Sequence, residues 1–171
     1  MSKRTRYLAH AAIIAALYAV LTHLQNLLLP NSASMAIQMR MSEALCVLAF
    51  FTPAAIPGLA VGCLIFNVTF SAALPLDFLV GTLASYLAAQ GMWLTRKVTV
   101  KGYPLLGMLM PALTNAILVG WELTVYIGEA FWINALYVAI GEAVVLLVLG
   151  SALYYAMKAR HLDTKLFALE R

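Results

Sequence analysis

Charge is scarce in this sequence. Only 11% of its 171 residues are charged, whereas 64% are hydrophobic, and the mean hydropathy is +0.91. A soluble domain carries about 25% charged and about 45–50% apolar residues. The excess apolar surface needs an apolar solvent, so the composition excludes an ordinary soluble domain and indicates a membrane protein. The length fits a single membrane domain over residues 1–171.

Reactive and metal-binding motifs are also missing. The two cysteines, Cys46 and Cys63, lie in apolar runs without the spacing of metal ligands, so we expect small buried side chains and no metal site. The sequence contains no phosphate-binding P-loop, no H-E-x-x-H zinc motif and no G-x-S-x-G nucleophile motif. These absences exclude the familiar nucleotide-hydrolysing and protease machinery. We therefore expect neither an enzyme nor a resident cofactor.

Basic residues are concentrated at three places along the chain, and the net charge is +4. They precede the first apolar run, separate two later runs and close the chain: Lys3, Arg4 and Arg6; Arg96, Lys97 and Lys101; Lys158, Arg160, Lys165 and Arg171. Positive residues beside apolar runs are typical of the cytoplasmic ends of membrane spans. The pattern differs from a phosphate-binding surface, so we expect contact with membrane lipid and none with nucleic acid.

Long apolar runs predict the helices. Four of them cover residues 7–29, 76–96, 104–127 and 131–157. Residues 41–70 form a further apolar stretch, but residues 52–58 (TPAAIPG) place two prolines and a glycine in its middle. These residues should break a helix. The stretch is therefore expected to form two short helices.

The positive-inside rule tests this break independently. If residues 41–70 form one helix, the basic cluster at residues 96–101 lies opposite both termini; if they form two, all three basic groups share one side. We therefore predict an all-α protein of six transmembrane helices in the cell membrane, with both termini cytoplasmic. The second helix, residues 42–51, is about 15 Å long, too short to span alone. It must be tilted or shielded by its neighbours.

Small residues repeat at helical spacing in the first predicted helix. Two neighbouring stripes are formed by Ala11, Ala15 and Ala19 and by Ala12 and Ala16. Small side chains allow another helix to approach closely in a membrane. Two interpretations stay open: packing against helices of this chain, or docking to a separate membrane subunit. Gly58 and Gly62 have the same spacing and the same two interpretations.

Charged residues in a membrane cost at least about 2.5–3.5 kcal/mol each and are therefore functional candidates. Arg40 and Glu43 are three residues apart at the start of the second helix, where they either pair with each other or face a ligand. Asp77 follows Pro75 by two residues, so it either stabilises a helix N-terminus or contacts a ligand.

Polar residues recur on one face of the predicted fifth helix. Asn115, Glu122 and Tyr126 are seven and four residues apart, and we interpret this face as a cavity wall rather than polar helix packing. Trp132 begins the sixth helix, where an aromatic side chain is usually an interface anchor. Glu142 lies about 15 Å deeper, where it would complete an internal hydrogen-bond network or pair with a cation.

Six segments carry a resemblance to a known family. They are residues 38–45 (QMRMSEAL), 51–59 (FTPAAIPGL), 62–65 (GCLI), 73–77 (ALPLD), 121–123 (WEL) and 135–142 (ALYVAIGE). In this order they resemble the signature of the QueT family over nearly the whole chain. Residues 66–72 (FNVTFSA) depart from it, because the family tends to have small, glycine-rich residues there.

The resemblance implies an S-component-like bundle, the substrate-binding S component of an energy-coupling factor (ECF) transporter. The implied ligands are queuosine precursors, namely queuine and related deazaguanines. In such systems two ATPase subunits hydrolyse ATP and a transmembrane scaffold subunit joins them to the S component. The S component binds substrate outside and topples in the membrane to release it inside. The missing P-loop and the alanine-rich first helix agree with that division of labour.

A deazaguanine ring presents two adjacent N–H donors on one edge, a carbonyl on another, and flat faces. Carboxylates suit the donor edge, amide or guanidinium donors suit the carbonyl, and aromatic rings suit the faces. The expected substrate-binding residues are Gln38, Arg40, Glu43, Asp77, Asn115, Trp121, Glu122, Tyr126 and Trp132. Among the carboxylates Glu122 is preferred for the ring and Glu43 is its rival.

Two other functions remain compatible with the residues. The first is an autonomous carrier in which Asp77, Glu122 or Glu142 relays protons. The second is a small intramembrane enzyme that uses a pair of carboxylates. Transport assays distinguish them, because an S component needs ATP and partner subunits, a carrier works alone on a gradient, and an enzyme converts its substrate chemically.

Overall fold

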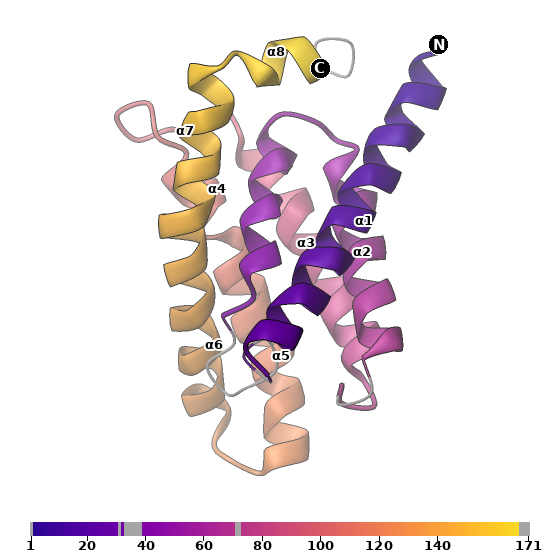
Figure 1. Ribbon diagram of the computed structural model, residues 1–171. Helices are drawn as coiled ribbons and strands as arrows, with labels where there is room; N and C mark the ends of the chain where they lie inside the picture. The colour runs from indigo at the N-terminus through magenta and orange to yellow at the C-terminus, as the bar shows by residue number, and fades with distance from the viewer. Residues whose placement is uncertain (1, 31, 33–38, 71–72, 168–171) are drawn as a thin grey trace.

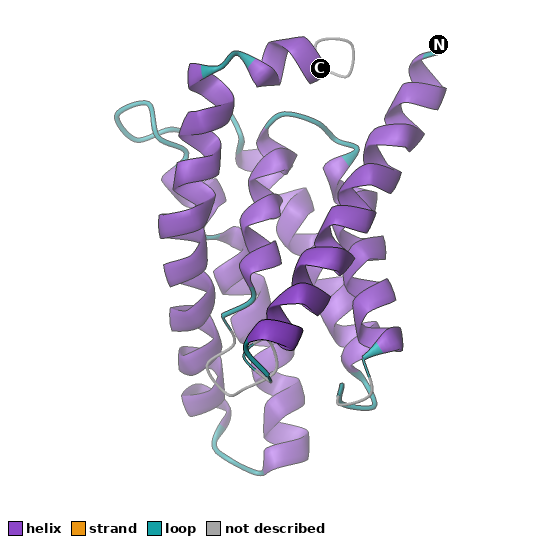
Figure 2. Cartoon of the chain, viewed as in Figure 1, coloured by secondary structure: helices purple, strands orange, loops and turns teal. Residues whose placement is uncertain are grey.

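A computed structural model describes residues 2–30, 32, 39–70 and 73–167 (Figure 1). Within these ranges the chain is helical and has no β-strand, only an isolated bridge between Val100 and Tyr103 (Figure 2). The helices are α1 (Lys3–Leu28), η1 (Met41–Phe50), α2 (Ala55–Thr69), α3 (Asp77–Thr95), α4 (Leu105–Met108), α5 (Met110–Ile127), α6 (Phe131–Val145), η2 (Leu146–Gly150), α7 (Ser151–Ala159) and α8 (Leu162–Phe167). The all-α prediction is confirmed.

The predicted break after the second helix is also confirmed. η1 ends at Phe50, a turn follows, and α2 begins at Ala55 with Pro57 in its first turn. η1 is a 3₁₀ helix, whose rise of about 2 Å per residue makes ten residues about 20 Å long. Most of its side chains are buried, so neighbouring helices shield this short segment, as the sequence required.

Within the described ranges, three helical segments are long and apolar enough to cross a membrane. They are α1, the combined α4 and α5 (Leu105–Ile127), and the combined α6, η2 and α7 (Phe131–Ala159). Large apolar side chains cover the outside of the bundle; Leu27 is 77% exposed and Val148 is 61% exposed. An apolar exterior of this kind is stable in lipid. The count of six membrane spans stays a prediction, and the short helix α8 was not predicted.

Helices α1 and α2 pack closely because α2 carries glycine at the contact. A Cβ atom on Gly62 would lie 2.7 Å from the Cβ of Tyr18 and 2.8 Å from the carbonyl oxygen of Ala15. A Cβ atom on Gly58 would lie 2.8 Å from the carbonyl oxygen of Ala11. The close approach of the two backbones therefore depends on both glycines. Of the two interpretations of Gly58 and Gly62, the structure supports packing against a helix of the same chain.

This contact corrects part of the predicted docking surface. Ala15 and Ala19 are buried inside the fold, at 5% and 6% exposure, so most of each side chain is hidden from a separate subunit. Ala11 is half-buried, whereas Ala12 and Ala16 are exposed. The sequence could not show which of the two alanine stripes is buried and which is exposed, because both have the same spacing and the same residue type.

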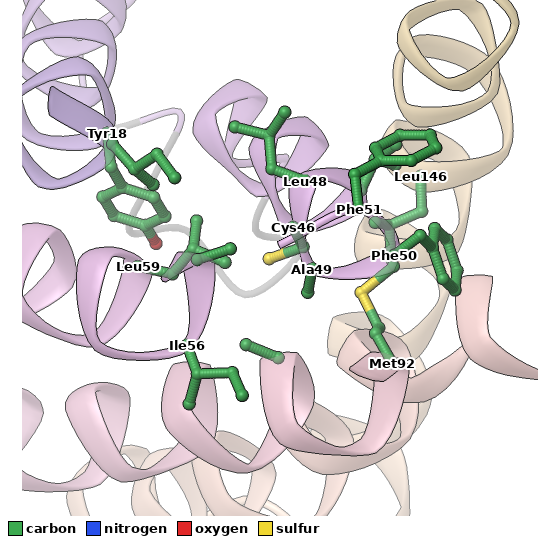
Figure 3. Close-up of a cluster of buried hydrophobic side chains, with 14 of the residues drawn as sticks. Tyr18, Cys46, Leu48, Ala49, Phe50, Phe51, Ile56, Leu59, Met92 and Leu146 are labelled. Carbon is green, nitrogen blue, oxygen red and sulfur yellow. The ribbon is translucent and has the colours of Figure 1, made fainter. Parts of the chain in front are cut away.

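The hydrophobic core surrounds η1. Figure 3 shows Cys46 in the middle of this cluster, with Tyr18 of α1 on one side and Leu146 of η2 on the other. Phe51 stacks on Tyr154 of α7 with ring centroids 5.6 Å apart. η1 is thus held from several sides, and this placement fixes the polar residues at its first turn.

The two ends of the bundle differ in charge. Both chain ends lie at the same end in Figure 1, together with the loop between α3 and α4 that contains Lys97 and Lys101. The three basic groups of the sequence therefore gather at one end, as far as the structure describes them. Which side of a membrane this end faces stays a prediction.

A labelling experiment tests that orientation. Thr99→Cys places a thiol in the basic loop, and Ser32→Cys places one near the opposite end. In intact cells we expect a membrane-impermeant thiol reagent to label Ser32→Cys and to spare Thr99→Cys. The wild-type protein is the control, because Cys46 and Cys63 are both buried. Labelling of Thr99→Cys, with or without Ser32→Cys, contradicts the six-helix topology.

Candidate functional site

The interior of the bundle contains an unusual number of ionisable side chains. One guanidinium and four carboxyl groups are buried there, with exposures of 9% or less: Arg40, Glu43, Asp77, Glu122 and Glu142. They come from the start of η1 and from α3, α5 and α6. The structure thus brings together four residues of the predicted binding set and adds Glu142 to them.

Glu43 is fully engaged by its own chain. The hydroxyl group of Tyr18 on α1 donates a hydrogen bond to its Oε1, and the thiol of Cys46 donates to its Oε2 at 3.0 Å. Glu43 is 1% exposed. Both carboxylate oxygens therefore have partners within the chain, and the Tyr18 bond joins α1 to η1.

A polar stripe on α1 fixes the first turn of η1. The amide of Gln25 accepts a hydrogen bond from the backbone N–H of Met41 at 2.7 Å and donates to the carbonyl of Met39 at 2.7 Å. One turn earlier, the hydroxyl of Thr22 donates to that of Ser42 at 2.6 Å. These bonds satisfy backbone groups that a helix start leaves open, and they set the position of Arg40 between Met39 and Met41.

Arg40 occupies the centre of this interior. Its guanidinium carbon lies 5.5 Å from the ring centroid of Phe66, and its Nη1 lies 3.7 Å from the sulfur of Cys63. It interacts electrostatically with Glu43, Glu122 and Glu142. A buried positive charge is tolerated only where opposite charges compensate it. The carboxyl groups that interact with Arg40 come from three helices, η1, α5 and α6.

Asp77 has the helix-terminal function considered from the sequence. Its Oδ2 accepts a hydrogen bond from the backbone N–H of Leu74 at 2.7 Å, at the start of α3. The side-chain amide of Asn67 on α2 donates to its backbone carbonyl at 2.7 Å. Asp77 also interacts electrostatically with Glu122 on α5. The structure therefore places two carboxyl groups from different helices near each other.

The deeper part of the polar interior joins α5 and α6. The amide of Asn115 donates to Oε1 of Glu142 at 2.9 Å, which confirms that Glu142 completes an internal hydrogen-bond network. Nearer the α5–α6 turn, the amide of Asn134 donates to the hydroxyl of Thr124 at 3.2 Å. A Cβ atom on Gly120 would lie 2.9 Å from Cα of Ala135, so these two helices are also in close backbone contact.

Acceptor oxygens are in surplus. Several buried ones have no hydrogen-bond donor among the described residues: Oε1 and Oε2 of Glu122, Oε2 of Glu142, Oδ1 of Asn67 and Oδ1 of Asn134. Native proteins leave few such groups, so each calls for a reason. With four buried carboxyl groups and one buried guanidinium, the interior is suited to a ligand that brings N–H donors or positive charge.

The predicted aromatic residues do not join this interior. Trp121 is 50% exposed, Tyr126 is 39% exposed and Trp132 is 79% exposed, so all three lie on the outside of the bundle. Trp132 packs edge-on against Phe131 with centroids 4.9 Å apart, as an interface anchor would. Gln38 lies outside the described residues. The spacing of seven and four residues predicted that Tyr126 shares a helix face with Asn115 and Glu122. Tyr126 instead lies near the end of α5, beyond the packed part of the bundle.

Several polar residues of the network were missed from the sequence, among them Tyr18, Cys63 and Asn67. Tyr18 is a phenol inside an apolar helix, Cys63 was interpreted only as a small buried side chain, and Asn67 was not considered for the site. A polar side chain within an apolar run was the available signal for Tyr18 and Asn67. Their partners were unpredictable, because Glu43 and Asp77 lie on other helices.

An apolar exterior thus encloses a polar interior that holds several buried carboxyl groups. A family model described as QueT transporter matches residues 8–159. The chain belongs to the QueT transporter family. No match is found among curated proteins or among solved structures.

The Tyr18–Glu43 bond is expected to stabilise the fold. Tyr18→Phe removes the hydroxyl donor and leaves Oε1 of Glu43 buried without it. We expect a loss of about 1–2 kcal/mol in the free energy of unfolding, measured by reversible denaturation in detergent. Tyr137→Phe is the control, because Tyr137 is 38% exposed. Equal effects of the two substitutions would show that the buried bond contributes nothing.

Proposed function

We propose that this protein is the S component of an ECF-type, ATP-powered importer and that it binds queuosine precursors. In this proposal it has six membrane helices, with its basic end in the cytoplasm. The observation that carries the proposal is the surplus of buried acceptor oxygens, above all both oxygens of Glu122. Membership of the QueT family supports a transport function, and the chemistry of the acceptors supports a donor-rich substrate.

Deazaguanines match this interior in three respects. Their two adjacent N–H donors suit the paired oxygens of one carboxylate, here Glu122. An aminomethyl cation on the ring suits a second carboxyl group, and Asp77 is the one that interacts with Glu122. The ring carbonyl requires a donor, which Arg40 provides at the centre of the same set.

The hydrogen bonds favour one of the two rival carboxylates. Glu43 already has a donor on each oxygen, from Tyr18 and Cys46, so a ring edge would gain less there than at an unpartnered carboxylate. Glu122 is 0% exposed and has no donor on either oxygen within the described part of the chain. A ligand donor there would satisfy buried groups, so Glu122 is the preferred contact.

Glu122→Gln tests this contact. The substitution is nearly isosteric, but it replaces one acceptor oxygen with an NH₂ donor that opposes the N–H groups of the ring. We expect affinity for queuine and for its aminomethyl precursor to fall at least about tenfold, because a charged hydrogen bond contributes about 1.5–3 kcal/mol. Calorimetry on the purified protein measures the change.

Glu129→Gln provides the matched control, since Glu129 is exposed in the turn between α5 and α6. It should leave both affinities unchanged. Wild-type affinity in Glu122→Gln for both ligands would remove this residue from the site and return Glu43 to consideration. Failure of the wild-type protein to bind either compound would refute the proposed substrate class itself.

Partner subunits complete the proposed transporter. Two ATPase subunits hydrolyse ATP and a scaffold subunit docks in the membrane, so this chain carries no cofactor. The exposed alanines Ala12 and Ala16 offer a surface for that scaffold. A cavity of about 340 Å³ lies between α1 and α2; it is lined by Tyr7, Leu8, Ala11, Ala12, Ala15, Pro57 and Val61, so the edge of Ala15 also reaches it. Small residues beside a groove permit close approach of another helix.

The docking surface is tested by added bulk. In Ala12→Leu/Ala16→Leu, uptake by cells that express all partner subunits should fall several-fold, while substrate affinity of the isolated protein is kept. Ala152→Leu/Ala156→Leu is the matched control, because these exposed alanines on α7 have the same spacing. Equal uptake in the two double variants would exclude this part of α1 as the docking surface.

The second candidate function is an autonomous proton-coupled carrier. It is favoured by the same unpartnered carboxyl oxygens of Glu122 and Glu142, which are buried where a proton relay would need them. Reconstitution separates the two proposals. The purified chain alone in vesicles should show no uptake driven by a proton gradient, whereas uptake without partners would establish the carrier.

A further inference from the structure

A cavity lies at the basic end of the bundle, away from the first turn of η1 that carries Glu43. Its volume is about 380 Å³, in the range of small-molecule sites. It is bounded by the C-terminal ends of η1, α3 and α7, at the end of the bundle that carries both termini. Its lining consists of aromatic and basic side chains: Phe50, Phe51, Trp93, Arg96, Lys97, Tyr154 and Lys158.

The cations of this cavity are held against its aromatic walls. The guanidinium carbon of Arg96 lies 3.6 Å from the ring centroid of Trp93, and its Nη1 donates to the Trp93 carbonyl at 2.5 Å. The ammonium group of Lys158 lies 5.5 Å from the ring centroid of Phe51. Cation–π contacts of this kind orient the charged groups and limit their motion before any ligand arrives.

Positive charge remains in excess here. Among the described residues, the one ion pair formed by the three lining cations is that of Lys158 with Asp163 of α8, at 3.2 Å. Cations at helix C-termini stabilise the helix dipole, and the Arg96 bond to the Trp93 carbonyl is an example. Stabilisation of a helix dipole explains neither the cavity nor the presence of three cations from two helices around it. The arrangement is instead suited to an anion with several oxygens.

We propose that this cavity binds the phosphate group of an anionic lipid. The guanidinium of Arg96 donates hydrogen bonds to the phosphate oxygens, and Lys97 and Lys158 add positive charge. The aromatic side chains of the lining contact the glycerol and the first acyl carbons. Aromatic and basic residues at the end of a membrane helix lie at the depth of lipid headgroups. The proposal requires membrane insertion but not the deazaguanine substrate.

Calorimetry on the full-length protein in an uncharged detergent tests the proposal. The probes are dioctanoyl phosphatidylglycerol, dioctanoyl phosphatidylcholine and inorganic phosphate at constant ionic strength. The phosphatidylglycerol should bind about tenfold more tightly than the phosphatidylcholine with the same chains, since each basic group contributes a several-fold preference. Equal affinities overturn the proposal. Saturable binding of inorganic phosphate at similar affinity would replace the lipid by a soluble phosphate.

A pair of double variants locates the binding. Arg96→Gln/Lys97→Gln should abolish the tenfold preference, whereas Arg160→Gln/Lys165→Gln, which removes two exposed charges at the same end, should keep it. Equal losses in both would show attraction to the whole basic end and refute a specific site. The single variant Lys97→Gln covers the case in which the first double variant does not fold, because Lys97 is exposed and its substitution should leave the fold intact. It should weaken the preference for phosphatidylglycerol about threefold.

Discussion

The structure depends on one buried positive charge. Arg40 lies in the interior of a bundle whose outside is apolar, at 8% exposure. Its desolvation would be prohibitive without compensation. Carboxyl groups from three separate segments, Glu43, Glu122 and Glu142, interact with it. This need for compensation ties η1, α5 and α6 to a common centre and accounts for the number of acids inside an apolar protein.

The same centre requires precise placement of η1. This helix is short and mostly buried, and the side chains of Tyr18, Thr22 and Gln25 on α1 hold its first turn. α1 can do so because Gly58 and Gly62 let α2 approach its backbone from the other side. The glycines thus set the distance between α1 and α2. The hydrogen bonds from α1 set the position of η1 along α1.

The polar interior and the basic end of the bundle offer opposite kinds of hydrogen-bonding group. Unpartnered acceptor oxygens of Glu122 and Asn67 characterise the interior, where they favour a ligand with N–H donors. Oriented cations, Arg96 and Lys158, characterise the cavity at the end with both termini, where they favour phosphate. Each set follows from a local excess of one kind of hydrogen-bonding group.

The sequence by itself determined the all-α class, the apolar exterior and the break between η1 and α2, because hydropathy and proline act locally. It also identified Arg40, Glu43, Asp77, Asn115 and Glu122 as functional candidates, since polar and charged side chains are costly in lipid. Only the tertiary structure decided which oxygens are already satisfied. Tyr18 and Cys46 occupy both oxygens of Glu43, and no described residue donates to Glu122. Tertiary structure also separated residues that share one spacing: Ala12 is exposed, whereas Ala15 in the same helix is covered by α2. Helical periodicity relates residues within one helix, but burial and hydrogen-bond partnership depend on which neighbour covers each face, and long-range packing makes that choice.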